Sequence, residues 1–253
     1  MNKIILKLSK ERFSYFKYFI FTYLKRDKIY EKFVEKDVFF IPFKKRLKPA
    51  YLKALVRFLK RKKIERILPF DEEIKESLRK DFSIINGKNI YRTIFCNVLS
   101  FLAENKLDNY EIVFISDNIA EIKKQAEQCV KKVKSISVLT DKAYLYESMR
   151  DYFLEKYGVM INIRTKKEKL KKHNKIYVNA GAVRVYERSA FKNVNLLDIY
   201  NVYEGGYRHI ILENNSYSKE YTNLLKCSHT AALAEFLDEE KKVKNLKIVN
   251  IKK

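Results

Sequence analysis

The sequence of 253 residues is poor in the residues that interrupt regular structure, with five glycines, three prolines and no tryptophan. This scarcity excludes collagen-like and low-complexity chains and argues against long irregular loops. The three cysteines, Cys96, Cys129 and Cys227, are odd in number and far apart. We therefore expect reduced thiols in a cytoplasmic protein rather than a disulfide framework.

Long hydrophobic runs are also lacking. The most apolar stretch near the N-terminus is FSYFKYFIFTYL, residues 13–24, which is about a dozen residues long and carries Lys17. A membrane-spanning helix needs roughly 20 apolar residues, and a secretory signal needs a small-residue cleavage site. We expect neither integral membrane association nor secretion. Because 47% of the chain is apolar, it can bury a core in one large domain or two ordinary ones.

Several motifs that carry chemistry are absent: G-x-x-x-x-G-K-[ST], H-E-x-x-H, C-x-x-C and G-x-S-x-G. The three histidines are scattered, and no pair has metal-ligand spacing. Cys227 and His229 are too close in sequence to form a nucleophile–base pair on one helix face. The sequence therefore predicts no metal site and identifies no catalytic residue.

Negative charge is scarce, and the formal net charge is +23. Residues 1–70 hold 21 Lys and Arg against 6 Asp and Glu, whereas residues 71–110 hold 6 against 7. Such a local excess attracts polyanions. The alternative is a compositional bias toward lysine without a functional role.

Residues 1–106 are expected to form a basic N-terminal α/β domain. Apolar runs predict strands at 3–8, 37–43 and 65–70, the last two ending at Pro42 and Pro69. Helices are expected at 13–34, 49–64, 71–80 and 90–105, and "NGKN" at 86–89 is a turn.

Residues 107–253 are expected to form a second, more regular α/β domain. We predict strands at 111–116, 136–140, 159–164 and 175–179, alternating with helices at 118–134, 143–157 and 166–172. Gly158 ends the second of these helices as a C-terminal cap would. The strands are continuously apolar, which is typical of parallel strands covered on both faces, and predicts a doubly wound sheet. Further strands are expected at 194–200, 207–213 and 246–251, and a helix at 228–242.

Residues 110–182 resemble the Rossmann domain of the shikimate dehydrogenase and glutamyl-tRNA reductase kind. The resemblance rests on the long helix before the first strand, on Asp141 after the second, and on "NAGA", 179–182, after the fourth. It implies NAD(P) as cofactor, with Asp141 binding the ribose hydroxyls and the turn at Asn179 and Gly181 lying beside the nicotinamide.

The first loop departs from this family, which has G-x-G-x-x-[GA] where this chain has "SDNIAE". The glycines allow the backbone to approach a diphosphate that binds the helix N–H groups. Ser116, Asp117 and Asn118 occupy that place, and the charge of Asp117 would oppose a phosphate. We interpret Asp117 or Asn118 as a helix N-cap, which disfavours NAD(P).

Asp141 and Gly181 have structural alternatives. An aspartate between a strand and a helix is commonly an N-cap or turn residue, and Gly181 would suit a turn that needs a positive φ. The carboxyl end of a strand is nevertheless where open α/β sheets bind ligands.

Three functions remain open from the sequence. The first is a Rossmann-like binding or regulatory protein with an altered or decayed nucleotide site, with an NAD(P)-dependent oxidoreductase as its catalytic variant. The second is a nucleic-acid or other polyanion binding protein, with Tyr51 and Phe58 as stacking groups and phosphate contacts from Lys44, Lys45, Arg46, Lys48, Lys53, Arg57, Lys60, Arg61, Lys62 and Lys63. The third, a peripheral membrane protein using residues 13–28, ranks last because the apolar residues there are not confined to one face.

Overall fold

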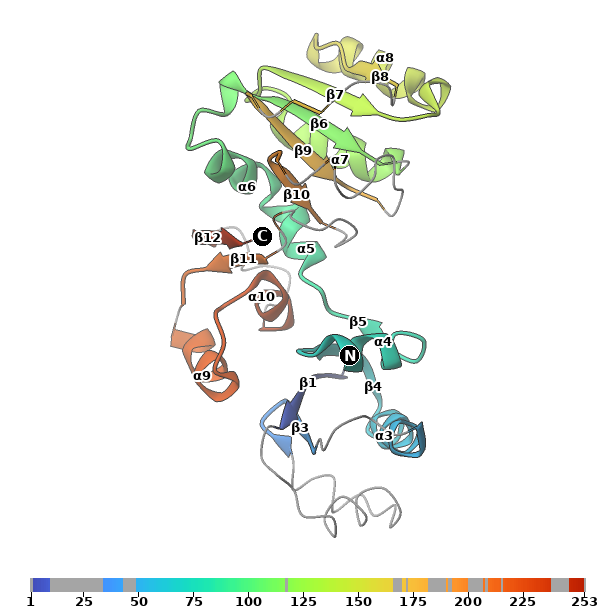
Figure 1. Cartoon of the computed structure of the whole chain (residues 1–253), viewed down its shortest axis with the longest axis vertical. Coiled ribbons are helices and arrows are strands. Elements are labelled where there is room, and N and C mark those ends of the chain that lie inside the picture. Colours follow the sequence, from blue (N-terminus) through green and yellow to red (C-terminus); the bar gives the residue numbers. More distant parts are fainter. Residues whose placement is uncertain are drawn as a thin grey trace. The chain divides into compact units, whose positions relative to one another are not determined.

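The computed structural model describes residues 2–9, 34–42, 49–116, 118–165, 170–171, 173–181, 190, 193–199, 207, 209–214, 216–237 and 246–252. The chain divides into two compact units (Figure 1). The first unit comprises residues 1–87, 221–227 and 232–237, and the second comprises 88–220, 228–231 and 238–253. These ranges differ from the predicted domains 1–106 and 107–253, because residues 88–106 belong to the second unit and two C-terminal segments belong to the first.

The first unit is built on a five-stranded sheet, sheet A, with the order β2-β3-β1-β4-β5. All neighbours are parallel except β2 and β3, which are antiparallel. The strands are β1 (Asn2–Ser9), β2 (Val34–Glu35), β3 (Val38–Pro42), β4 (Ile64–Pro69) and β5 (Ser83–Ile84). The predicted strands at 3–8, 37–43 and 65–70 are thus confirmed, whereas the helix predicted at 13–34 lies outside the described residues.

Two helices cover one face of sheet A. Helix α3 (Pro49–Arg61) begins with proline in its first turn, where the missing N–H is not needed. Its apolar residues recur at helical spacing and are buried, and Phe58 contacts Phe39 of β3 with ring centroids 5.7 Å apart. Helix α4 (Glu72–Leu78) adds Ile74 and Leu78 to the same core.

The C-terminal helices supply the opposite face of sheet A. Residues from α9 (Ser216–Leu225) and α10 (Ala231–Leu237) pack on Ile5, Val38 and Leu68 of the sheet. Two lysines of β1 bind the last carbonyls of these helices: Lys7 Nζ donates to Leu225 and Lys3 Nζ to Phe236. A cation at this position also complements the helix dipole. Helix α9 was not predicted, and α10 is shorter than the expected helix 228–242 within the described residues.

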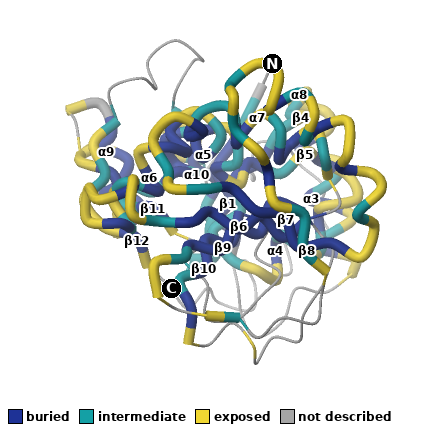
Figure 2. Tube along the Cα trace, turned by 90° about the horizontal axis from the view of Figure 1, so that it is seen from above, coloured by how far each residue is buried: buried dark blue, intermediate teal, exposed yellow. Residues whose placement is uncertain are grey.

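The second unit is built on a parallel five-stranded sheet, sheet B, with the order β10-β9-β6-β7-β8. Its strands are β6 (Glu111–Ile115), β7 (Ser135–Leu139), β8 (Asn162–Arg164), β9 (Lys175–Asn179) and β10 (Leu196–Asp198). Numbered along the chain within this unit, the order is 3-2-1-4-5 from the β8 edge, which is the order of the Rossmann fold. The predicted α/β class with a doubly wound, mostly parallel sheet is confirmed. Figure 2 shows the buried central strands.

Helices of the second unit connect and cover these strands. They are α5 (Lys88–Thr93), α6 (Phe95–Leu102), α7 (Ile119–Cys129) and α8 (Glu147–Tyr157), with short 3-10 turns at Leu107–Asn109 and Ala143–Tyr146. Phe95 of α6 stacks on Phe114 of β6 at a centroid distance of 6.0 Å. Gly158 caps α8 with φ of 65°, which confirms the predicted C-cap.

The single helix predicted at 90–105 is wrong in one respect, because α5 and α6 are separate helices. Ile94 interrupts them with φ of −105° and ψ of 18°. The Thr93 hydroxyl donates to the Asn89 carbonyl at 2.9 Å, so a side chain occupies a backbone acceptor just before the break. A separate antiparallel pair, β11 (His209–Leu212) and β12 (Ile248–Lys252), completes the described part of this unit.

One carboxylate links four strands of sheet B. Glu111 on β6 contacts Ser137 of β7 through a hydrogen bond from its hydroxyl. It also pairs with Arg164 of β8 and Lys175 of β9, both at 2.8 Å. Burial alone would raise the pKa of Glu111, but hydrogen bonds from Lys175 and Ser137 and the two positive charges outweigh it and lower the pKa.

No helix among the described residues has the length and hydrophobicity needed to cross a membrane. All three cysteines are free thiols, with Cys96 and Cys129 buried.

We predict that Glu111→Gln destabilises the second unit by about 3 kcal/mol at neutral pH, because it leaves two partly buried cations without their anion. The lowered pKa means that ionised Glu111 contributes stability above the ordinary carboxyl range. That contribution is lost as the pH falls through the lowered pKa. The difference between wild type and variant in urea unfolding should therefore shrink toward acid pH.

The control is Glu213→Gln, which removes an exposed ion pair with Lys247 at 3.5 Å in the same unit. Such a pair contributes at most about 1 kcal/mol. An equal effect of both substitutions would contradict the role assigned to Glu111.

Candidate functional site

The carboxyl edge of sheet B is the place where a doubly wound sheet holds ligands, above all where the chain leaves its two central strands in opposite directions. Here those strands are β6 and β9. Ser116 and Asn118 follow β6, Thr140 and Asp141 follow β7, and Asn179 ends β9 just before Gly181. Five of the six predicted cofactor-binding residues therefore follow or end strands of this edge, and the sixth, Asp117, lies outside the described residues.

The N-terminus of α7 is capped by the protein itself. Asn118 is the N-cap, and its Oδ1 accepts a hydrogen bond from the N–H of Glu121 at 3.1 Å. The N–H of Asn118 donates to Ser116 Oγ at 2.9 Å. The capping interpretation of Asn118 is confirmed. Two backbone donors that could bind a phosphate are thus already occupied.

The first turn of α7 also contains a buried carboxylate that the sequence reading missed. Arg92 of α5 donates from Nε to Glu121 Oε1 at 2.7 Å and from Nη2 to Oε2. Gln125 Nε2 donates to the same Oε1 at 2.9 Å. Burial would raise the pKa of Glu121, but the hydrogen bond and charge of Arg92 outweigh it and lower the pKa. The Asn-x-x-Glu spacing is a capping-box signal that could have indicated Glu121, although not its partner Arg92.

Gly181 is required for space and not for its dihedral angles. A Cβ placed on Gly181 would lie 2.1 Å from Ser116 Oγ and 3.1 Å from Ser116 Cβ. Among the described glycines, positive φ occurs at Gly87 and Gly158 and not at Gly181. The expected positive φ at Gly181 is therefore wrong. The turn after β9 instead packs directly on Ser116.

Asn179 joins the ends of two strands. Its Nδ2 donates to Asp198 Oδ1 at 2.9 Å, and its Oδ1 accepts from the N–H of Gly181 at 3.4 Å. Both side chains are buried. The amide therefore bonds to β10 and to its own turn, which makes Asn179 a positioning residue for Gly181. Asp198 was not predicted, and its only signal in the sequence is an aspartate at the end of the apolar run NLLD.

Asp141 is exposed and lies in the bend that follows β7. A hydrogen bond stabilises the bend, because Thr140 Oγ1 accepts from the N–H of Lys142 at 3.0 Å. The buried Tyr146 donates its hydroxyl proton to the carbonyl of Ser116. This bond connects the segment after β7 to the segment after β6. Asp141 is thus an exposed turn residue, and a ribose contact at this position stays a prediction.

The family resemblance implied a dinucleotide, whose diphosphate would lie at the start of α7. A diphosphate needs close backbone approach and open N–H groups at the start of α7. This chain has Ser116 in contact distance of Gly181, and side chains that already bind the N–H groups of Asn118 and Glu121. A diphosphate bound in the usual position would have to displace these contacts.

Two weaker candidates are explained by packing. The Nδ1 of His229 lies 3.1 Å from the carbonyl of Glu213, and burial lowers the pKa of this imidazole. Burial raises the pKa of the Cys227 thiol, which opposes a nucleophilic role. Within the described part of the chain, no three His, Cys, Asp or Glu side chains form a group that could hold a metal ion.

The predicted nucleic-acid residues are divided by the structure. Lys53, Arg57, Lys60 and Arg61 are exposed on α3, whereas Lys44, Lys45 and Arg46 lie outside the described residues. Tyr51 is fully buried and Phe58 is 2% exposed. The proposal that these two rings stack on bases is wrong, because both belong to the core beneath α3.

No protein-family model matches the chain, and no curated protein matches it. Solved structures with a similar course of the chain include quinate dehydrogenase from Corynebacterium glutamicum in complex with NAD. It is 11% identical and has a TM-score of 0.37, with 96% of each chain covered. Shikimate 5-dehydrogenase from Listeria monocytogenes in complex with shikimate and NAD is 10% identical with a TM-score of 0.34, covering 95% of this chain and 93% of that one.

A chorismate mutase/shikimate 5-dehydrogenase fusion protein from Clostridium acetobutylicum is 18% identical. Its TM-score is 0.29, and 79% of this chain and 78% of that one are covered. The strand order and parallel direction of sheet B are sufficient to identify its fold.

We predict that Gly181→Ala destabilises the second unit by about 1–3 kcal/mol, since the new methyl group overlaps Ser116 Oγ. In a Ser116→Ala background the same substitution should cost less, because the overlapping oxygen is gone. The double-mutant cycle from urea unfolding measures this coupling.

Gly158 provides the control, because a Cβ there meets nothing within 4 Å and the constraint is its φ of +65°. Gly158→Asn should be tolerated, since asparagine adopts this conformation readily. Its cost should not change in the Ser116→Ala background. Strict additivity at Gly181 and Ser116 would contradict the assigned contact.

Proposed function

We propose that this protein is a Rossmann-like binding protein whose second unit takes a nucleoside-type ligand at the carboxyl edge of sheet B, without a diphosphate at the N-terminus of α7. The observation that carries the proposal is the closed start of α7, where Ser116 and Asn118 bind two of the backbone N–H groups. A dinucleotide enzyme needs these groups for its cofactor.

The exposed carboxylate of Asp141 supports the ribose part of the proposal. It follows the strand next to β6, and it lies 24 residues after Asp117 in the sequence, near the spacing of a ribose-binding carboxylate. A carboxylate accepts two hydroxyl donors at once, which suits a vicinal diol. The side chains of Asn179 and Asp198 are bound to each other. We therefore place the ligand at the ends of β6 and β7.

The alternative within the same site is an NAD(P)-dependent oxidoreductase. That function requires the diphosphate to bind without the glycine loop. The two possibilities differ in what a diphosphate adds to affinity, and this difference can be measured.

We expect adenosine and NAD to bind the full-length protein with affinities within tenfold of each other, because the diphosphate has no prepared site. Thermal melts against adenosine, AMP, NAD, NADP, FAD and S-adenosylmethionine measure this. A ligand present at about 100 times its Kd adds about 2.7 kcal/mol of stability. Asp141→Asn should abolish the shift, whereas Asp108→Asn, an exposed aspartate of the same unit, should not.

Two results would overturn the proposal. An NAD affinity more than tenfold above that of adenosine would mean that the diphosphate is bound, in favour of the oxidoreductase. The lack of any shift with all six compounds would mean that this edge holds no nucleotide-type ligand.

A further inference from the structure

The two edges of sheet B differ in how they are covered. At the β10 edge all three strand residues are buried, and the N–H of Tyr207 donates to the carbonyl of Leu196 at 2.6 Å. At the opposite edge, Asn162 of β8 is exposed and Ile163 is half-buried. Within the described part of the chain, β7 is the only strand that pairs with β8 (Figure 1). Strand β8 is therefore the open edge of this sheet.

The backbone of Ile163 faces this open side. The carbonyl of Arg164 accepts from the N–H of Thr140 at 3.1 Å, so Arg164 directs its backbone groups toward the β7 side. Successive residues of a strand direct these groups in opposite directions, so the N–H and C=O of Ile163 point outward. Open edges are commonly protected by lysine, proline or a bulge, and β8 has none of these. Its one cation, Arg164, pairs with Glu111 inside the sheet.

Exposed apolar side chains surround β8. Six large apolar side chains are exposed among the described residues, and four of them lie between positions 144 and 160. Tyr144 and Leu145 belong to the 3-10 turn that contacts both α8 and β8, whereas Leu154 lies on α8 and Met160 lies just before β8. We call these four residues and Ile163 the β8 surface.

Leu154 projects from the side of α8 that faces away from α7. On the other side, Tyr152 donates its hydroxyl proton to Glu127 of α7. Successive residues of a helix are about 100° apart, so Leu154 and Tyr152 lie on opposite sides of the buried Phe153. Helices α7 and α8 connect successive parallel strands by right-handed crossovers and therefore cover the same face of sheet B. The side away from α7 is thus the side beyond the edge strand β8.

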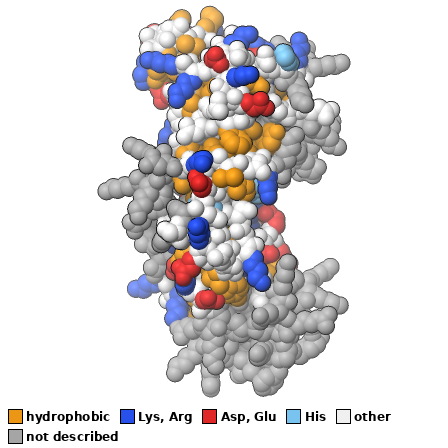
Figure 3. Space-filling model, turned by 90° about the vertical axis from the view of Figure 1, so that its left-hand side faces the viewer, with side chains coloured by type: hydrophobic (Ala, Val, Ile, Leu, Met, Phe, Trp, Pro, Cys, Tyr) orange, Lys and Arg blue, Asp and Glu red, His pale blue; other side chains and the backbone are white. Residues whose placement is uncertain are grey.

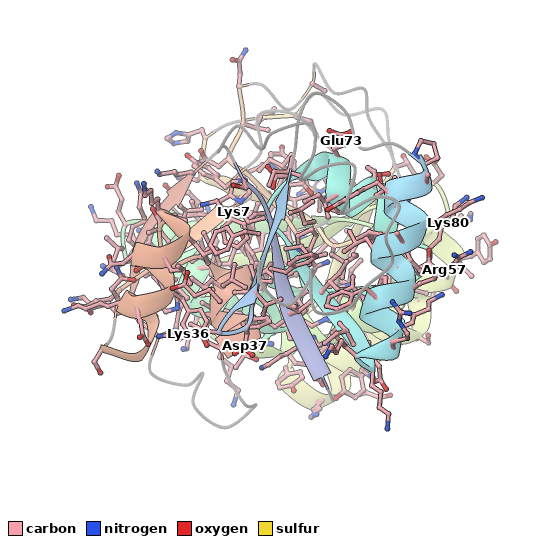
Figure 4. All side chains as sticks on the ribbon, turned by 90° about the horizontal axis from the view of Figure 1, so that it is seen from below. Lys7, Lys36, Asp37, Arg57, Glu73 and Lys80 are labelled. Atoms are coloured by element: carbon pink, nitrogen blue, oxygen red, sulfur yellow. The ribbon has the colours of Figure 1, made fainter. Side chains whose placement is uncertain are left out.

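Charge decides which partner suits the β8 surface. Residues 141–164 contain four acidic and four basic residues, so the rest of the chain carries the whole net charge of +23. A neutral, partly apolar surface does not attract a nucleic acid or an anionic membrane. Two copies of the chain can meet there without a local excess of one charge. Figure 4, by contrast, shows the exposed cations Arg57 and Lys80 at the surface of the first unit, where a second copy would bring like charges together.

We propose that the β8 surface is a homodimer interface, in which β8 pairs with the β8 strand of a second copy across a two-fold axis. Strands related in this way are antiparallel, and residues opposite each other in an antiparallel pair exchange two hydrogen bonds. Ile163 binds Ile163 of the partner subunit through its outward N–H and C=O. The axis is perpendicular to the sheet, so the two α8 helices lie on one face with their Leu154 side chains between them.

The pairing of two short strands is too small for a stable dimer, which buries about 800 Å² on each partner. Helix α8 and the apolar side chains beside it therefore supply most of the interface. The dimer does not depend on the ligand of sheet B.

The experiment is sedimentation equilibrium of the full-length protein, which measures the Kd of the dimer. One variant is Leu154→Glu, which places an acid in the interface from each copy. A second is Ile163→Pro, which removes the outward N–H and keeps the bonds to β7, since proline is tolerated at such edge positions. The matched control is Phe101→Glu, which changes an exposed apolar residue of helix α6 in the same unit. Circular dichroism melts check that all variants are folded.

We expect the wild type to dimerise and each interface variant to raise the Kd by about tenfold or more, because both copies carry the change. The control should keep the wild-type Kd. Raising the salt concentration from about 50 to about 500 mM should tighten the dimer, because salt screens the repulsion between two positively charged chains.

Other results would overturn the proposal. A wild-type monomer at about 100 μM would exclude an interface of standard size. A dimer that neither interface variant weakens would have its interface elsewhere. Equal weakening by Phe101→Glu would assign the association to apolar exposure in general. A dimer that weakens as salt rises would indicate bridging by a polyanion, whose binding releases counterions.

Discussion

The second unit depends on one carboxylate placed among the strands of its sheet. Glu111 lies on the central strand β6 and contacts a residue from each of β7, β8 and β9. These strands come from positions as far apart as 111 and 175, and the ladder hydrogen bonds alone join only neighbours. A charge buried to this extent is stable because two cations and a hydroxyl bind it. The register that it helps to fix determines which residues meet at the carboxyl edge.

Polar groups at the carboxyl edge of sheet B are likewise bound by the protein itself. A helix N-terminus has unsatisfied N–H groups, which either a ligand or the protein must bind. In this chain the Asn118 side chain binds the N–H of Glu121, Ser116 binds the N–H of Asn118, and Gly181 packs on Ser116. The sheet therefore has the strand order of a Rossmann fold, and two N–H groups at the start of α7 are bound by the protein itself. Asp141, which follows the neighbouring strand β7, is exposed.

Local patterns in the sequence predicted most of the elements and some of the site. Apolar runs located β6, β7 and β9, and the glycine after α8 marked its end, because strand burial and helix capping depend on nearby residues. The N-cap role of Asn118 was predictable for the same reason. Contacts between residues distant in the chain were not predictable, because only the fold brings the segments together. They are the pair Arg92 and Glu121, the pair Asn179 and Asp198, and the packing of α9 and α10 on sheet A. Gly181 was recognised as constrained, but the constraint is space beside Ser116, which a dihedral argument could not reveal.

The large positive charge has more than one origin in this structure. Lys3 and Lys7 bind helix carbonyls, and Lys175 binds Glu111, so these lysines hold the fold together. On the face in Figure 3, basic and acidic side chains are interspersed over the described surface, which gives no concentrated field there. Net charge therefore says little about function in this chain until each cation is assigned a contact.

The exposed side of α3 differs because its cations are regularly spaced and the helix contains no acid. A regular row of this kind is not needed for packing, since the opposite side of the helix already supplies the core. Helix α3 therefore has a structural side and a charged side.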